Sequence, residues 1–332
     1  MLREGWYVAC AASQLGGSPR AVRVLDQDLV VFRDGGGRSR ALLDRCCHRG
    51  VKLSLGRVTD GNIACGYHGW QYDGAGRCVM VPSLPASSAI PSALRVPAFP
   101  CVERDSYVWV WMGQAEPMPS GPPRIEHIDQ YGWTQGVSPM RCSATMLIEN
   151  QFDTAHPAFA HAGTHPSYFL SRVTGRQEYS FEVRTTDEGM LAFYPTTESA
   201  KAPIPSEYKT LTRFELPSRV YIHQRILKME FFVLVHIVPT SERSCRMEWL
   251  QRGKKGASGI TWVDQEPKLI EQDRLLLESA QPSYDDGEVF ERSVGADYVT
   301  VMVRRVVALA ASGRWHEERC KLPRRRIVHL RS

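Results

Sequence analysis

The stretch CCHRGVKLSLGRVTDGNIACGYHGWQY, residues 46–72, decides the fold of the N-terminal part of the chain. It contains two pairs of metal-binding side chains, Cys46 with His48 and Cys65 with His68, and 16 residues lie between the pairs. Thiolate and imidazole groups are the ligands that zinc and iron sites commonly use. We therefore expect two loops that bring these four side chains to one metal centre.

Two kinds of metal centre use two cysteines and two histidines. A structural zinc site usually keeps two to four residues between its first two ligands. A Rieske [2Fe-2S] cluster instead places two thiolates on one iron and two imidazoles on the other. The single residue between Cys46 and His48 favours the cluster over zinc. Cys47 is then a spare thiol, because only Cys46 keeps the spacing of one residue to the histidine.

The strings CHRG and GYHGW resemble the cluster loops of Rieske non-haem iron oxygenases. In that family, tight turns with glycine let backbone N–H groups approach the sulfur atoms. Cys47 departs from the small residue or proline that is usual at its position, and Gly66 replaces a proline that is common there. Neither change removes a ligand. The resemblance extends from WYVA near the N-terminus to VTVMVRRVVALAA at 299–311.

The chain is long enough for two domains, at 332 residues. The proline-rich run AEPMPSGPPR at 115–124 indicates a junction. We predict a Rieske domain over 1–115 and a catalytic domain with a basic tail over 116–332. The tail, residues 321–332, has five Lys and Arg residues and no acid. We interpret it as a solvated, frayed terminus, and we expect no nucleic-acid partner.

The cellular location of the protein is predicted from its cysteine usage and hydropathy. Nine cysteines without a recognisable secretory signal favour reduced thiols over disulfides. No uninterrupted apolar run reaches the length of a membrane span. We expect a cytoplasmic protein without a membrane partner.

The pattern of apolar residues predicts an α+β protein. Up to about residue 111, short strands alternate with Gly, Pro and Asp, which indicates an all-β domain with a hairpin over 71–78. The second domain is expected to contain strands near 139–148, 178–194, 219–238 and 244–250, and helices near 150–165, 266–281 and 296–312. By resemblance, this domain is a helix-grip (START-like) antiparallel sheet with helices packed on it.

A second metal motif follows in ENQFDTAHPAFAH, residues 149–161, with Asp153, His156 and His161. On an uninterrupted helix these three side chains would share one side, although Pro157 is expected to bend or restart the helix. The string resembles the mononuclear-iron motif of the same oxygenase family. It implies His156 and His161 as ligands of mononuclear Fe(II), with His165 as a competitor. Two imidazoles and one carboxylate on one face of iron leave positions open for dioxygen and substrate.

The carboxylate that would complete this set of three iron ligands is predicted on the helix DQEPKLIEQDRLLLESA, which should begin at Asp264 or Pro267. Asp273 falls on its apolar stripe, defined by Leu269, Ile270, Leu276, Leu277 and Ala280. A carboxylate on a buried face needs a cation, so Asp273 is either the third iron ligand or a member of a buried salt bridge. The resemblance favours the ligand. Asp264, Glu266 and Glu271 are weaker candidates.

The resemblance implies further roles. Asn150 aligns with a residue near the iron, where it either orients a ligand or substrate or caps the helix. Asp153 would bridge the cluster ligand His68 to the iron ligand His156. In the family, a head-to-tail homotrimer brings the cluster of one subunit close to the mononuclear iron of its neighbour. His223 and His236 are interpreted as core or surface histidines, with substrate contact as the alternative. Aromatic residues such as Phe231 and Trp249 are candidates for the pocket lining, although each is more often a core residue.

No glycine-rich dinucleotide fingerprint follows a strand, so a separate NAD(P)H-dependent reductase, a ferredoxin or both must supply electrons. The implied function is the oxygenase component of a monooxygenase in the vanillate, dicamba and saxitoxin-pathway branch. It would use dioxygen to hydroxylate or demethylate a small ring-containing substrate. The alternatives are a cis-dihydroxylating aromatic ring dioxygenase and, from other classes, a Rieske electron carrier or a zinc-bound module.

Overall fold

We describe the protein from a computed structural model. The structure describes residues 2–85, 87–125, 128, 133–165, 168, 172–173, 175, 178–193, 209–226, 229–253, 266–286 and 291–331. The chain forms two compact units, Arg3–Ile128 and Asp129–Ser332, with Met1–Leu2 belonging to the second. Each unit is described by itself below.

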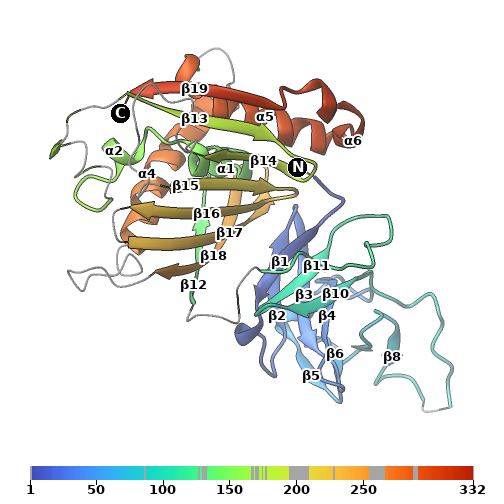
Figure 1. Cartoon of the computed structure of the whole chain (residues 1–332). Helices are drawn as coiled ribbons and strands as arrows, with labels where there is room; N and C mark the ends of the chain where they lie inside the picture. The colour runs from blue at the N-terminus through green and yellow to red at the C-terminus, as the bar shows by residue number, and fades with distance from the viewer. Residues whose placement is uncertain are drawn as a thin grey trace. The chain divides into compact units, whose positions relative to one another are not determined.

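The N-terminal unit is built from three antiparallel sheets (Figure 1). The first has the order β1-β11-β10, the second β2-β3-β4-β9, and the third β5-β6-β7-β8. The strands are β1 Trp6–Ala11, β2 Arg20–Val24, β3 Gln27–Arg33, β4 Ser39–Leu43, β5 Arg57–Thr59, β6 Asn62–Ala64, β7 Gln71–Tyr72, β8 Cys78–Met80, β9 Ala98–Phe99, β10 Cys101–Arg104 and β11 Tyr107–Trp111. The predicted all-β domain is therefore confirmed.

Two strands of this unit are buried along their whole length, which explains their continuous apolar sequences. Every residue of β1 and of β11 is buried, and the two strands pair antiparallel from Trp6 opposite Trp111 to Ala11 opposite Tyr107. A strand buried on both faces has no solvent-facing side and so does not alternate apolar with polar residues. The predicted hairpin over 71–78 is also confirmed, because β7 pairs with β8.

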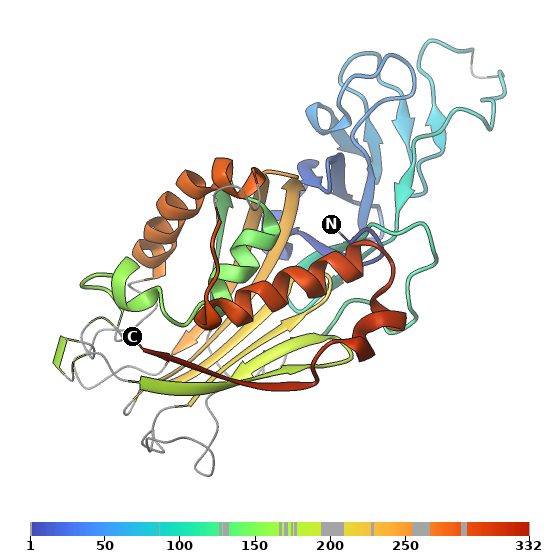
Figure 2. The ribbon, with the colours of Figure 1, turned by 90° about the horizontal axis from the view of Figure 1, so that it is seen from above.

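The C-terminal unit contains one antiparallel sheet of eight strands in the order β12-β18-β17-β16-β15-β14-β13-β19. Figure 2 shows helices α1 and α5 lying across one face of this sheet. The elements are β12 Thr134–Met140, α1 Ala144–Phe152, α2 Pro157–Ala160, β13 Glu178–Thr185, β14 Gly189–Phe193, β15 Lys209–Glu215, β16 Arg219–Ile226, β17 Met229–Ser241, β18 Ser244–Gly253, α4 Glu266–Asp285, α5 Tyr298–Ala311, α6 Trp315–Glu318 and β19 Arg325–Arg331. This is the expected antiparallel sheet with helices.

The core of this unit lies between the sheet and its helices. Leu147 and Phe152 of α1, Met302 and Val306 of α5, and Val235 of β17 belong to one buried cluster. Burying such side chains contributes about 1.5–3 kcal/mol each relative to leaving them in water.

No described helix is long and apolar enough to cross a membrane.

An ion pair ties α1 to α5 beside this core. The buried Glu149 accepts hydrogen bonds of 2.7 Å from Nε and from Nη2 of Arg304, and one of 2.9 Å from the hydroxyl of Tyr284. Burial raises the pKa of Glu149, although Arg304 opposes this shift. The pairing keeps a carboxylate at the helix interface satisfied, so α1 is fixed against both α4 and α5.

The strand predicted over 139–148 is wrong. The segment leaves β12 at Met140 and forms helix α1 from Ala144, whose N-cap Ser143 accepts a hydrogen bond from the backbone N–H of Met146. Met146, Leu147 and Ile148 are all buried. A short helix buried around most of its surface shows the same continuous apolar run as a strand, so periodicity does not separate the two.

The prediction of a frayed basic terminus is also wrong. Residues Arg325–Arg331 form β19, which pairs antiparallel along β13. Val328 and Leu330 are buried, and Arg325 makes an ion pair of 2.9 Å with Glu182. The guanidinium of Arg326 lies 4.1 Å from the ring centroid of Tyr298. Val328 and Leu330 anchor the strand on one face, where Arg326 also contacts Tyr298, whereas Arg325 and Arg331 lie on the other face.

Candidate active site: two metal-binding constellations

The two predicted cluster loops have the same backbone construction. The N–H of Cys46 donates to the carbonyl of Val51 at 2.9 Å, and the N–H of Gly50 donates to Cys46 at 2.9 Å. In the second loop Cys65 N–H donates to Trp70 at 2.8 Å, and Gly69 donates to Cys65 at 3.0 Å. Gly50 and Gly69 have φ values of 74° and 72°, a region that side chains disfavour. Each loop therefore needs its glycine to turn the chain.

The four predicted ligands converge at the tips of these loops. Cys46 and Cys65 are 3% and 2% exposed, and their thiols contact one another. The ring centroids of His48 and His68 lie 4.7 Å apart, and His68 is exposed. Trp70 stacks on His48 with ring centroids 4.4 Å apart.

The residues fit a Rieske cluster. Buried Nδ1 of His48 has no hydrogen-bond partner among the described residues, which suits an atom that is a metal ligand. Burial raises the pKa of Cys65, and Cys46 raises it further. Two buried thiols in contact become favourable as thiolates only next to a cation, which the cluster iron provides. The pairing of inner cysteines with outer histidines matches the two irons of the cluster.

A tyrosine beneath the loops contacts both thiols of the first loop. The hydroxyl of Tyr72 lies 3.0 Å from Sγ of Cys46 and 3.3 Å from Sγ of Cys47. Tyr72 is fully buried, and burial raises its pKa far above the ordinary value, so the hydroxyl keeps its proton. With Cys46 bound to iron as a thiolate, Tyr72 donates to that sulfur.

The Tyr72→Phe variant is expected to lower the reduction potential of the cluster by tens of millivolts. Hydrogen bonds to ligand sulfurs stabilise the reduced form, which carries more negative charge, and the variant removes one. Potentiometric titration of the purified protein measures the shift, and Cys47→Ser is the companion variant. An unchanged potential in Tyr72→Phe would show that the hydroxyl does not donate to the cluster ligand.

The second motif is a turn between two short helices, not one continuous helix. Helix α1 ends at Phe152, Asp153 has extended backbone angles, and α2 begins at Pro157. Oδ1 of Asp153 accepts hydrogen bonds of 2.8 Å from Ala155 N–H and 3.3 Å from His156 N–H. The expected helix restart at Pro157 is confirmed, and the turn at Asp153 shows that no single uninterrupted helix carries these three side chains.

The turn and helix α4 together form a group of three potential ligands. His156, His161 and Asp273 each offer an atom that lies within 4.8 Å of the other two. Oδ1 of Asp273 is 3.6 Å from Nε2 of His156 and 3.4 Å from Nε2 of His161. Both histidines therefore point the same ring nitrogen at the same carboxylate oxygen, which is the arrangement of two imidazoles and one carboxylate around one cation.

The electrostatics of this group suit a metal cation. Burial lowers the pKa of both His156 and His161, so the imidazoles are neutral and offer lone pairs. Burial raises the pKa of Asp273 to about 6. Oδ1 of Asp273 has no hydrogen-bond partner in the described part of the chain. A buried carboxylate oxygen left unpaired between two neutral imidazoles is costly without a cation, so the donor set fits iron.

Helix α4 carries Asp273 on a stripe that differs from the predicted one. Leu269, Ile270 and Gln281 are buried and Leu277 is half-buried, but Leu276 and Ala280 are exposed. Asp273 still lies on the inner side, with 13% of its side chain exposed. Of the weaker candidates, Glu271 faces outward and pairs with Arg274, and Asp264 lies outside the described residues.

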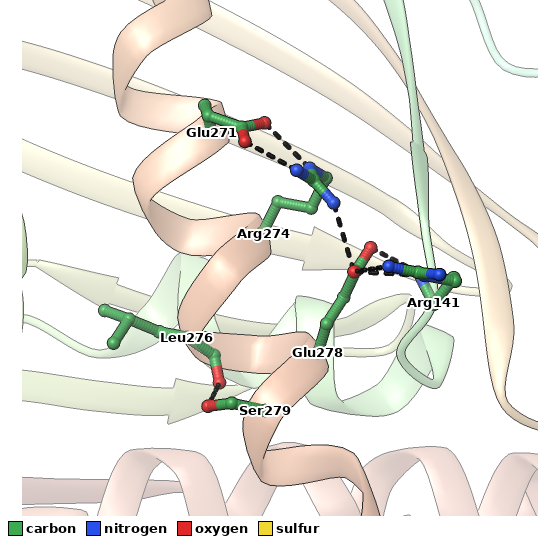
Figure 3. A network of polar contacts seen from close by, with 6 residues as sticks. All are labelled: Arg141, Glu271, Arg274, Leu276, Glu278 and Ser279. Carbon is green, nitrogen blue, oxygen red and sulfur yellow. Dashed lines mark hydrogen bonds and ion pairs between the residues drawn. The ribbon is translucent and has the colours of Figure 1, made fainter.

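An ionic network holds α4 in place next to the start of α1 (Figure 3). Glu278 accepts three hydrogen bonds from Arg141, at 3.0 Å from its N–H, 3.1 Å from Nε and 3.0 Å from Nη2. Arg274, the residue after Asp273, donates to Glu278 at 3.1 Å and to Glu271. The network joins the helix of the carboxylate ligand to the segment that leads to the histidines.

Gln272 is a site residue that sequence reasoning missed. Its Oε1 lies 3.1 Å from Nδ1 of His161 and accepts a hydrogen bond of 2.9 Å from the hydroxyl of Thr164. An amide oxygen only accepts, so Nδ1 carries the hydrogen and Nε2 keeps its lone pair toward Asp273. The position next to Asp273 was the available signal, but which side of the helix faces His161 depends on tertiary packing.

The Gln272→Leu variant is expected to bind iron about 10-fold to 100-fold more weakly, because the tautomer and orientation of His161 are no longer held. Gln272→Glu keeps an acceptor oxygen and should bind iron better than the leucine variant. Leu275→Ala, at an exposed position of the same helix, is the control. Titration of Fe(II) into iron-depleted protein measures the affinity, and equal affinity in Gln272→Leu and Leu275→Ala would contradict this role.

A cavity of about 160 Å³ opens next to the triad. Its described lining combines the three ligands with residues of α1 and of strands β15 to β18. Asn150 lines it and hydrogen-bonds Asp273, which opposes the rise in the pKa of that carboxyl. Phe231 is a lining residue, as expected, whereas Trp249 is a core residue that does not line the cavity.

The structure shows where three further histidines lie relative to the cavity. His165 lines the cavity, but its ring centroid lies 5.9 Å from that of His161, and it is not part of the ligand group. Burial lowers the pKa of His165 to about 3. His223 stacks on Phe232 with centroids 4.2 Å apart, and neither it nor the buried His236 lines the cavity. This agrees with the interpretation of His223 and His236 as core or surface histidines.

Comparison with known families matches both units. The model of the Rieske [2Fe-2S] domain matches residues 5–100, and that of the vanillate O-demethylase oxygenase C-terminal domain matches residues 140–312. The crystal structure of dicamba monooxygenase bound to dicamba has a TM-score of 0.75 at 23% identity, covering 94% of this chain and 98% of that one. This likeness shows the fold.

Two curated relatives illustrate the sequence similarity. Protein TIC 55, chloroplastic, of Arabidopsis thaliana is 35% identical over 184 residues, which are 54% of this chain and 34% of the relative. The oxygenase component of dicamba O-demethylase from Stenotrophomonas maltophilia is 35% identical over 165 residues, 48% of each chain. The chain thus spans between a third and a half of these relatives. Because the C-terminal model covers more than half of the chain and a Rieske model precedes it, the chain belongs to the Rieske non-haem iron oxygenases with a vanillate O-demethylase type C-terminal domain.

Proposed function

We propose that this protein is the oxygenase component of a monooxygenase that hydroxylates or demethylates a small ring-containing substrate. The observation that carries the proposal is the group of His156, His161 and Asp273 beside a cavity, in a chain that also holds two Cys/His cluster loops. A carrier of electrons alone has no use for this second site. The relatives' names include demethylases and monooxygenases, which supports the same reaction class.

The residues divide into two sets with different roles. Cys46, His48, Cys65 and His68 would hold the cluster, and His156, His161 and Asp273 would hold mononuclear iron. When bound, the iron supplies the activation of dioxygen next to the substrate. Gln272 keeps Nε2 of His161 available, and Asn150 holds Asp273 by a hydrogen bond. Apolar side chains such as Leu147, Ile222 and Phe231 share the lining of the cavity with these polar groups.

Asp153 is assigned as the residue that links the two metal sites. Its Oδ2 lies 3.8 Å from Nδ1 of His156, which is buried and has no hydrogen-bond partner among the described residues. Its side chain is 40% exposed, so one edge remains available to the exposed His68 of a second copy in a homotrimer. A carboxylate that accepts from two imidazoles sets the tautomer of both.

Electrons must come from a separate reductase or ferredoxin under this proposal, with dioxygen and substrate as the other reactants. The names of the dicamba and vanillate relatives, an oxygenase component and an oxygenase subunit, support such a division of labour. The homotrimer and the cytoplasmic location stay predictions, and three of the relatives are named as chloroplast proteins.

The test is product mass under ¹⁸O-labelled dioxygen. Purified protein, a surrogate reductase with NADH, and a panel of methylated and unsubstituted ring compounds are analysed by liquid chromatography and mass spectrometry. One labelled oxygen atom gained, or a methyl group lost as formaldehyde, supports monooxygenation. Two labelled atoms in the product would show the cis-dihydroxylase instead. Iron analysis showing only the two cluster irons would favour the electron carrier.

A further inference from the structure

The floor of the cavity is formed by two rows of side chains on neighbouring strands. In one row Thr212 of β15, Ile222 of β16, Val233 of β17 and Gln251 of β18 are register partners. In the next row Thr210 pairs with Gln224, and Gln224 with Phe231. Residues two apart on a strand point to the same face, so both rows face the helices and the triad.

The amide oxygens of two glutamines on this floor have no hydrogen-bond partner among the described residues. Gln251 is only 1% exposed, and its Oε1 is buried without a hydrogen-bond partner in the described residues. Oε1 of Gln224 is buried and unpartnered in the same way, and both residues line the cavity. A buried polar group without a partner is costly, and a leucine of similar size would fill either position without that cost.

The rest of the lining restricts what could pair with these amides. The described lining residues of the cavity include no lysine and no arginine. They include the carboxyl groups of Asp153 and Asp273, together with apolar groups such as Met247, Phe231 and Ile270. A substrate carboxylate would lose its hydration here without gaining an arginine or lysine partner from these residues.

An amide presents a donor and an acceptor side by side, so its complement is a group that does the same. We propose that the substrate is a neutral ring that carries adjacent N–H and C=O groups, as a lactam or a cyclic imide does, and that Gln224 and Gln251 bind these groups. The inference rests on the proposed function and adds the substrate class. The two glutamines lie two strands apart, about 10 Å across the sheet at the backbone. Phe231 and Val233 of β17 lie between them, and Ile222 shares strand β16 and the same face with Gln224, so apolar side chains are available to contact the ring.

Binding, not turnover, tests this assignment. Isothermal titration calorimetry with the iron-loaded protein under argon compares 2-pyridone, N-methyl-2-pyridone, which lacks the N–H, and benzoate. We expect 2-pyridone to bind at least 10-fold more tightly than the other two. Gln224→Leu and Gln251→Leu should each weaken 2-pyridone binding about 10-fold and leave N-methyl-2-pyridone less affected.

Gln135→Leu is the matched control. Gln135 also has a buried, unpartnered amide nitrogen among the described residues, but it pairs with Leu250 and so lies on the opposite face of the sheet from Gln251. It should bind all three probes like the unaltered protein. Circular dichroism melting of each variant distinguishes a lost contact from a lost fold, and Gln251→Glu provides a second, more conservative variant that removes the amide donor.

Three results would overturn the proposal: no detectable binding of 2-pyridone, tighter binding of benzoate, or glutamine variants that bind like Gln135→Leu. Failure of the proposed function has a different signature. In that case no product would contain oxygen from labelled dioxygen, although the order of probe affinities and the effects of the glutamine variants were as expected.

Discussion

The Asp273→Ala variant is expected to contain one iron fewer per chain while the visible absorbance of the cluster persists. Oδ1 of Asp273 lies 3.6 Å from Nε2 of His156 and 3.4 Å from Nε2 of His161, so removing the carboxylate leaves two neutral imidazoles. Two neutral ligands hold Fe(II) much more weakly than the same ligands with an anion. Elemental analysis for iron and acid-labile sulfide measures both sites in one sample.

Glu271→Ala is the control, because Glu271 is an exposed carboxylate on the same helix that pairs with Arg274. It should retain all its iron. His156→Ala should behave like Asp273→Ala and also lose the mononuclear iron. An Asp273→Ala protein with a full complement of iron would show that another carboxylate is the third ligand.

The Asp153→Asn variant is expected to keep both metal sites and lose turnover by about 10-fold to 100-fold. Asparagine retains the oxygen that caps the turn by accepting from Ala155 and His156, so the local backbone is preserved. It removes the negative charge that would stabilise the imidazoles on either side. Single-turnover reoxidation of the reduced cluster in the presence of substrate measures the electron-transfer step directly.

Asp153→Ala, which also removes the cap, should be at least as impaired as Asp153→Asn. Asp187→Asn changes an exposed carboxylate that is distant from Asp153 in the sequence, so it serves as the control for the change of net charge. Full turnover in Asp153→Asn would exclude a role for the charge in linking the two sites. Loss of iron in the same variant would instead make Asp153 part of the metal site itself.

The cluster loops show how much of a site local sequence can predict. Cys46, His48, Cys65 and His68 lie within 23 residues, and each loop closes on itself through hydrogen bonds between residues four and five apart. Gly50 and Gly69 supply the left-handed backbone that the turns require. Because these constraints are short in range, the motif alone predicts which side chains converge.

The mononuclear site combines local and distant information. His156 and His161 were predicted from one motif, and Asp273 from the apolar pattern of a helix more than 100 residues later. The restart at Pro157 was expected, whereas the turn at Asp153, which separates α1 from α2, was not. Asp273 was placed correctly on the inner side of α4, although Leu276 and Ala280 of the predicted stripe are exposed.

Two secondary-structure errors have a common cause. Residues 144–152 form a buried helix and Arg325–Arg331 an edge strand, whereas a strand and a frayed terminus were expected. In both cases the contacts that stabilise the observed secondary structure are made with segments distant in sequence. Helix α1 packs against α5 and the sheet, and β19 pairs with β13. Periodicity reports which faces are apolar, but not what lies opposite them.

The sequence by itself therefore predicted two domains, the four candidate cluster ligands and the three candidate ligands of the second metal site. Their types and spacings are dictated by coordination chemistry and short-range backbone geometry. Only the tertiary structure decided that Gln272 contacts His161 and that Gln224 and Gln251 meet on the floor of one cavity. Strand register and helix rotation bring such residues together, and both are set by long-range packing, which leaves no local pattern around a single glutamine.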